Sequence, residues 1–254
     1  MSERPSTHLQ AAIERTERHL PLAIVPFLAS LLSLSKVAAL AAPQGGGGVS
    51  FPLPTGLPTL WTFVNARGRR RDLRPGHDRH GDALGAPVRG GLPADERARG
   101  GFLGALDPST DRSFADAVVH YLLPIVGANL LSLLAFVLAL PFVVFPPLAV
   151  VVIIVVGYAL YGMPFVIVVR DVGVWDAVRA SGGYALAGGE YLSYAAGYLL
   201  VGTVGSFVLT WLVYNTGIVG IVVGAALVAV PALFLTAFGV GVFRGLPDPE
   251  SVAV

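Results

Sequence analysis

The chain has 254 residues, of which 54% are hydrophobic and 13% are charged, and its formal net charge is +1. Soluble globular domains carry about 25% charged residues, so this composition, with a mean hydropathy of +0.71, excludes an ordinary soluble fold. The small net charge gives no electrostatic basis for binding nucleic acid. The absence of cysteine excludes disulfides, thiolate metal sites and a cysteine nucleophile.

Residues 1–19 form a polar N-terminal segment, and residues 20–42 form the first long apolar stretch. An α-helix needs about 20 apolar residues to cross a bilayer, so we predict the first transmembrane helix there, kinked at Pro26. Lys36 is the one charge inside this stretch. It is either an intramembrane functional residue or a side chain that extends to the nearby interface.

Residues 51–66 are apolar but irregular. Pro52, Pro54 and Pro58 disfavour a regular helix in the first half of the segment, and Trp61 suits a membrane interface. Three interpretations stay open: a re-entrant piece, a short second crossing or an interfacial segment.

Residues 67–112 are rich in arginine, glycine and proline, with ten arginines against seven acidic residues. Few of these residues are suited to building a core, so we predict a disordered, basic, cytoplasmic insertion. A cluster at its start either attracts anionic lipid or acts only as a topology signal. The cluster consists of Arg67, Arg69, Arg70, Arg71 and Arg74.

Ser113 and Asp116 have the spacing of a capping box and predict the start of a span at residues 117–140. Asn129 lies deep enough in this span to hydrogen-bond another helix. The chain therefore contains a four-helix transmembrane region at residues 113–244, followed by a tail at residues 245–254. The three further spans of this region are expected at residues 148–169, 191–213 and 218–243.

The number of crossings is five or six, depending on residues 51–66. With six crossings and a cytoplasmic N-terminus, every arginine falls on the cytoplasmic side, as the positive-inside rule favours. With five crossings and an external N-terminus, only Arg4, Arg15 and Arg18 fall on the wrong side. The arginine distribution favours six. We predict an all-α, polytopic transmembrane helix bundle in the plasma membrane, with both termini cytoplasmic.

Residues 170–189 connect two of the predicted spans and form an interfacial hairpin. We expect Asp171 to cap a short helix that Gly182 and Gly183 end, and Asp176 to pair with Arg179 three residues later. Trp175 lies on the apolar face of this helix, at head-group depth. These four side chains are candidates for contact with the interface or with a docking partner.

The residues around this hairpin carry a resemblance. The run PFVIVV at residues 164–169 is followed by Gly173-Val174 and then by DAVRAS at residues 176–181. This arrangement resembles a group of six-helix prokaryotic membrane proteins of unknown function. That group is similar to the membrane region attached to some glycerophosphodiester phosphodiesterases. The resemblance covers roughly residues 122–243 and implies a helical membrane bundle, without an activity to carry over.

A second resemblance concerns residues 176–182 alone. They are similar to the acidic-Ala-Ala-x-x-x-Gly loop by which importer permeases dock a cytoplasmic ATPase. The Ile-x-Leu-Pro that follows in that loop is missing at residues 192–195. This likeness implies an alternative function, a permease subunit that docks its ATPase through residues 171–183.

The sequence lacks the common catalytic and nucleotide-binding motifs. GxSxG, HExxH and P-loop patterns do not occur, no predicted span carries paired carboxylates, and no cofactor motif is present. Gly220 and Gly224 have helix-packing spacing and indicate a compact or dimeric bundle. We expect a non-enzymatic membrane accessory, scaffold or lipid-binding protein. Its expected partners are membrane lipids, a second copy of the chain or a membrane subunit.

Overall fold

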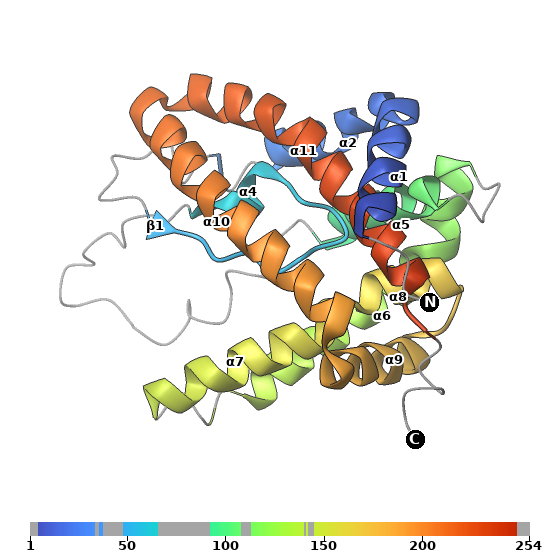
Figure 1. Ribbon diagram of the computed structural model, residues 1–254. Helices are drawn as coiled ribbons and strands as arrows, with labels where there is room; N and C mark the ends of the chain where they lie inside the picture. The colour runs from blue at the N-terminus through green and yellow to red at the C-terminus, as the bar shows by residue number, and fades with distance from the viewer. Residues whose placement is uncertain are drawn as a thin grey trace.

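The computed structural model describes residues 5–33, 36–37, 48–65, 92–107, 113–139, 141 and 145–247. Within these residues the protein is all-α apart from one short bridge of two-residue strands, as predicted (Figure 1). Four helical segments of the described chain are long and apolar enough to cross a membrane, and together they form a polytopic bundle. They are Phe114–Leu138, Pro147–Arg170, Gly189–Thr216 and Ile218–Gly245.

The described elements follow one another in a simple order. The N-terminal part contains α1 (Pro5–Arg18), the 3-10 turn η1 (Leu20–Ala23), α2 (Ile24–Leu32), β1 (Gly48–Val49), α4 (Leu60–Phe63) and β2 (Val64–Asn65). The C-terminal part contains α5 (Leu92–Leu106), α6 (Phe114–Leu138), α7 (Pro146–Leu160), α8 (Met163–Arg170), α9 (Val174–Ala187), α10 (Gly189–Thr216) and α11 (Ile218–Gly245). Ser113 caps the start of α6, where the Asp116 amide donates to Ser113 Oγ, and Ser113 Oγ donates to Asp116 Oδ2.

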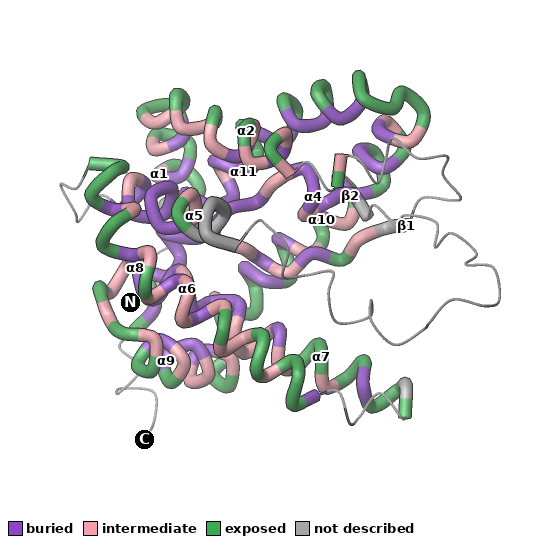
Figure 2. The backbone as a smooth tube through the Cα atoms, turned by 180° about the vertical axis from the view of Figure 1, so that it is seen from behind, coloured by how far each residue is buried: buried purple, intermediate pink, exposed green. Residues whose placement is uncertain are grey.

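Two helix pairs, α6 with α7 and α10 with α11, extend away from the end of the molecule where α9 lies. Gly217, with φ 60°, turns the chain between α10 and α11. Figure 1 shows α7 and α10 approaching each other near α9 and separating toward their other ends. Figure 2 shows buried residues concentrated along α8 and α11 and exposed residues along α7. The core of the protein therefore lies around α11 and α8, and α7 extends away from it.

The first predicted span differs from the structure. The apolar helical stretch at the N-terminus runs from Leu20 to Leu32 and is about 20 Å long, which is shorter than the roughly 30 Å of a bilayer core. Because α2 begins at Ile24, Pro26 falls in its first turn, where proline is tolerated without a kink. Residues 34–35 and 38–47 lie outside the described residues.

Residues 48–65 form a loop that returns to its starting point. β1 and β2 pair antiparallel, with Gly48 opposite Asn65 and Val49 opposite Val64, so the two ends of the loop lie side by side. The chain between them is extended as far as Thr59 and then makes the short helix α4. This geometry favours the re-entrant interpretation of residues 51–66. The choice between five and six crossings stays a prediction.

The loop at residues 48–65 is held inside the bundle by close contacts. The Ser50 amide donates to Ser206 Oγ of α10 at 2.8 Å, and the Leu60 amide donates to Ser30 Oγ of α2 at 3.0 Å. Leu53 packs against Gly157 of α7. Non-helical backbone at membrane depth is tolerated only where protein or water satisfies its polar groups. The three prolines of the loop remove amide donors that would otherwise need partners.

The helix α5 contradicts the predicted disorder of residues 67–112, in the part of that insertion that the structure describes. Phe102, Leu103 and Leu106 are fully buried. The glycines of α5 face α6, and a Cβ added at Gly104 would lie 2.6 Å from the Cβ of Ala117. The glycine-rich composition predicts disorder, but here the glycines permit two helices to pack closely. Residues 66–91, which include the predicted arginine cluster, and residues 108–112 lie outside the described residues.

Hydrogen exchange tests directly whether α5 is a packed helix and not part of a disordered insertion. We expect the amides from Arg99 to Leu106 to exchange slowly in the detergent-solubilised protein, because they belong to a helix whose side chains are buried against α6 and α11. Peptides from α10 provide the protected reference within the same protein. Exchange of the α5 amides at the rate of an unstructured peptide would contradict the packing and restore a disordered insertion.

Candidate functional site

The second long membrane segment is broken between α7 and α8, and side-chain hydroxyls stabilise the break. The carbonyls in the last turn of a helix lack helical partners. Tyr191 Oη donates to the Tyr158 carbonyl at 2.9 Å, and Ser181 Oγ donates to the Ala159 carbonyl at 2.7 Å. Tyr161 Oη donates in turn to the Tyr191 carbonyl at 2.6 Å. These hydroxyls replace the water that a membrane interior does not supply.

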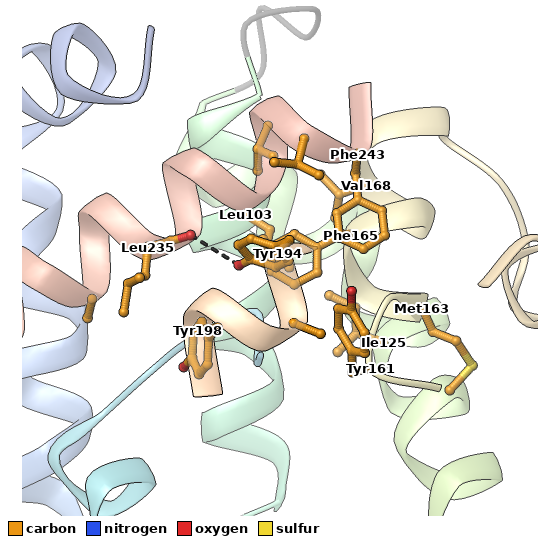
Figure 3. Packing of buried hydrophobic residues seen from close by; sticks show 14 of the residues in the cluster. Leu103, Ile125, Tyr161, Met163, Phe165, Val168, Tyr194, Tyr198, Leu235 and Phe243 are labelled. Atoms are coloured by element: carbon orange, nitrogen blue, oxygen red, sulfur yellow. Dashed lines mark hydrogen bonds between the residues drawn. The ribbon is translucent and has the colours of Figure 1, made fainter. Parts of the chain in front are cut away.

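An aromatic cluster surrounds this break. The rings of Phe165 and Phe243 are stacked, with centroids 4.9 Å apart. Tyr194 packs edge-on against Phe165, and its hydroxyl donates to the Leu235 carbonyl at 3.2 Å (Figure 3). The tyrosine hydroxyls of the cluster thus join α10 to the end of α7 and to α11 through hydrogen bonds to backbone carbonyls.

The substitution Ser181→Ala tests the role of the hydroxyl at the break. It removes the hydroxyl of the buried Ser181, which donates to the partly buried Ala159 carbonyl, so we expect the free energy of unfolding to fall by about 1–3 kcal/mol. Ser193→Ala is the matched control, because Ser193 is exposed and bonds only within its own helix. Its expected effect is within about 0.5 kcal/mol. Denaturant titration in detergent measures both, and equal effects would contradict the assigned role.

The interfacial hairpin has a different helix from the predicted one. Asp171 does not cap α9: it has a φ of 52° and ends α8, while α9 begins after Gly173. The helix also continues through Gly182 and Gly183 to Ala187. It stops at Gly188, whose φ of 69° suits glycine. The earlier glycines have open space around them and adopt helical geometry.

The candidate side chains of the hairpin are placed on its surface. Trp175 is 60% exposed, and the Arg179 guanidinium lies 5.4 Å from the centre of its ring. In the described part of the chain no ion pair joins Arg179 to Asp176, so the predicted pair is replaced by a cation–π contact. Asp171 instead lies 2.8 Å from His120 Nε2 and links α8 to α6.

The two intramembrane candidates have different surroundings. Lys36 is exposed, and its Nζ lies 6.0 Å from the centre of the Trp61 ring. Asn129 of α6 donates from Nδ2 to the Ile125 carbonyl at 3.1 Å, and its Oδ1 accepts from Arg99 Nη1 at 3.4 Å. Asn129 therefore hydrogen-bonds another helix, as expected. Its partner lies in the insertion that was predicted to be disordered.

A buried ion pair was missed by sequence reasoning. Asp107, at the end of α5, has a fully buried side chain and pairs with Arg244 at the end of α11. Arg15 of α1 lies nearby and donates to the Ala237 carbonyl at 3.5 Å. Burial, and then the charge of Arg244, lower the pKa of Arg15, while Asp107 opposes them. These groups place α1 and the C-terminal end of α11 at the same end of the molecule.

An extended apolar surface lies on what we call the α6–α7 arm, residues 130–138 of α6 together with α7. Its exposed side chains include Leu130, Leu133, Leu134 and Val137 on α6 and Val150, Val151, Ile153, Ile154 and Val155 on α7. Exposed apolar patches of this kind mark contacts with lipid or with another chain. The arm has Arg99 and Asn129 at its base, so a charged group and an apolar surface adjoin there.

Comparisons with protein-family models, with curated proteins and with solved structures find no match to this chain. The resemblance to the six-helix prokaryotic group thus stays an expectation, and the functional argument depends on the membrane bundle and its own residues.

Proposed function

We propose that the protein is a non-enzymatic membrane accessory protein that holds a lipid-like, apolar molecule against the α6–α7 arm. The observation that carries this proposal is the exposed apolar surface of the arm. Within the described residues, α7 packs against α9, against α6 and against Leu53 of the loop at residues 48–65. Most of its remaining surface is apolar and exposed, which suits binding of an apolar ligand at membrane depth.

The polar groups of the spans support a binding role over a catalytic one. The hydroxyls of Tyr161, Tyr191 and Tyr194 donate to backbone carbonyls, so these groups serve the fold. The arginines at the ends of α1, α8 and α11 lie at one end of the bundle. By the positive-inside rule this end faces the cytoplasm, and the membrane is the plasma membrane.

Purification from the native host in mild detergent tests the proposal, with co-purifying proteins and lipids identified by mass spectrometry. We expect one lipid-like species to be enriched relative to the bulk membrane. A matched preparation carries Val151→Ser and Ile154→Ser on the exposed face of α7 and should lose that enrichment. A lipid profile equal to the bulk membrane in both preparations would contradict the proposal.

The same purification also tests the alternative function, a permease subunit that docks an ATPase. A permease subunit should retain a stoichiometric ATPase, and this ATPase should be lost when Asp176 and Arg179 are both changed to alanine. Co-purification of such an ATPase would replace the accessory-protein proposal with the permease.

A further inference from the structure

The helix α9 lies at the membrane boundary. It follows the candidate span Pro147–Arg170 and precedes the candidate span Gly189–Thr216. Tyr184 Oη of α9 donates to the Pro247 carbonyl at 2.9 Å, and Arg170 Nη2 donates to the same carbonyl at 3.1 Å. The helix therefore belongs to the end of the bundle that holds the arginines of α1, α8 and α11, where the hydrocarbon core gives way to the lipid head groups.

The two faces of α9 differ in character. Ser181 and Tyr184 are buried on one face. Trp175, Arg179 and Leu186 lie on the opposite face, within about 40° of one another at about 100° per residue. Trp175 is 60% exposed, Leu186 is 93% exposed, and Arg179 is exposed as well. The exposed face thus combines an aromatic ring, a cation and an aliphatic chain, which is typical of a helix that lies in the membrane interface.

The Arg179 guanidinium is available to an anion at this surface. It lies 5.4 Å from the centre of the exposed Trp175 ring. Among the described residues, no carboxylate or carbonyl accepts a hydrogen bond from it. Of the two acids that precede it, Asp171 bonds to His120 at 2.8 Å, and Asp176 falls about 60° to the side of Arg179 around the helix. The N–H donors of Arg179 therefore face the surroundings of α9.

The surface next to Arg179 is open. Gly182 and Gly183 separate Arg179 from Leu186 along the exposed face, and an added Cβ at either glycine would meet nothing within 4 Å. A lipid head group can therefore approach the guanidinium beside the helix backbone.

We infer that the exposed face of α9 binds an anionic phospholipid of the adjacent leaflet. The head-group phosphate pairs with Arg179, whose planar fork of donors matches phosphate oxygens, and the upper part of the acyl chains contacts Trp175 and Leu186. The partner is a lipid because a candidate span at each end holds α9 at the head-group layer, and the charge of Arg179 favours an anionic head group there. This face is separate from the α6–α7 arm, so the inference goes beyond the proposed function.

Tryptophan fluorescence of the full-length protein in phosphatidylcholine nanodiscs tests the inference. Phosphatidylglycerol or phosphatidylcholine with brominated acyl chains is added at the same low mole fraction, since bromine quenches only tryptophan rings that touch the lipid. In a Trp211→Phe protein the signal comes from Trp175 and from the buried Trp61. One arginine near the surface enriches an anionic lipid about fivefold, so we expect brominated phosphatidylglycerol to quench Trp175 up to about fivefold more than brominated phosphatidylcholine.

Three variants serve as comparisons. Arg179→Gln should remove most of the difference between the two lipids, and Arg179→Lys should retain part of it, because lysine keeps the charge without the fork. Arg18→Gln removes the same charge from an exposed position on α1 and should leave the difference unchanged. In a Trp175→Phe protein the exposed ring is Trp211, at the other end of α10, and the two lipids should quench it equally.

Three results would overturn the inference. If neither brominated lipid quenches Trp175, the exposed face of α9 lies outside the membrane, as expected if an ATPase covers it. Equal quenching of Trp175 by the two lipids, with Arg179 in place, would show that the face contacts lipid without selecting an anionic head group. A preference for phosphatidylglycerol that survives Arg179→Gln would assign it to other charges. Because Trp175 and Arg179 are exposed, their substitution should leave the fold intact.

Discussion

Replacing Asp107 with leucine is expected to lower the free energy of unfolding by about 3–4 kcal/mol, because removal of one member of a buried ion pair leaves the other charge uncompensated. The Asp107 side chain is fully buried, and that of Arg244 is 27% exposed. The pair joins the ends of α5 and α11, and the partly exposed arginine keeps some access to water. Unfolding in denaturant, followed by tryptophan fluorescence in detergent, measures the change.

Two further variants make this test specific. Asp107→Leu combined with Arg244→Met removes both charges and should recover most of the lost stability, since apolar replacement of a whole buried pair is often neutral. Asp176→Leu changes an exposed carboxylate and should shift stability by less than about 0.5 kcal/mol. A double variant as unstable as Asp107→Leu would show that packing at position 107, not charge pairing, stabilises the junction.

Replacing Gly162 with alanine is expected to destabilise the protein by about 3 kcal/mol through overpacking at the helix break. The added Cβ would lie 2.8 Å from a ring carbon of Tyr191, 2.9 Å from a ring carbon of Phe243 and 2.9 Å from Ser181 Oγ. Contacts this short force the aromatic cluster to move. The movement also disturbs the hydroxyls that satisfy the break. Thermal unfolding in detergent reports the loss.

Gly183 provides the matched control for Gly162. It lies inside α9, and an alanine Cβ there would meet nothing within 4 Å. Gly183→Ala should raise stability by about 0.5–1 kcal/mol, because alanine favours the helix. If both substitutions changed stability equally, crowding at the break would not explain the requirement for glycine at position 162.

The sequence predicted the long spans because their signal is local. Continuous apolar runs and the helix-capping serine at position 113 act through neighbouring residues. The break between α7 and α8 was missed although Gly162 and Pro164 supply a local signal. The apolar run around them outweighed that signal.

The features missed in the insertion depend on long-range packing. Composition averaged over residues 67–112 obscured α5, whose glycines become informative only when Ala117 and Tyr121 lie against them. The contact of Arg99 with Asn129 could not be predicted from sequence, because it follows from the antiparallel packing of α5 on α6. The pairing of Asp107 with Arg244 joins residues 137 positions apart, so no local pattern predicts it.

Site-specific photo-crosslinking in native membranes tests the central claim most directly, that the α6–α7 arm holds one lipid-like molecule. A benzophenone side chain is placed at Ile154 on the arm and, as a matched control, at Val201 on the exposed face of α10. We expect Ile154 to capture a single amphiphilic species and Val201 to capture the bulk lipid mixture. The same bulk mixture at both positions, or a protein adduct at Ile154, would contradict the claim.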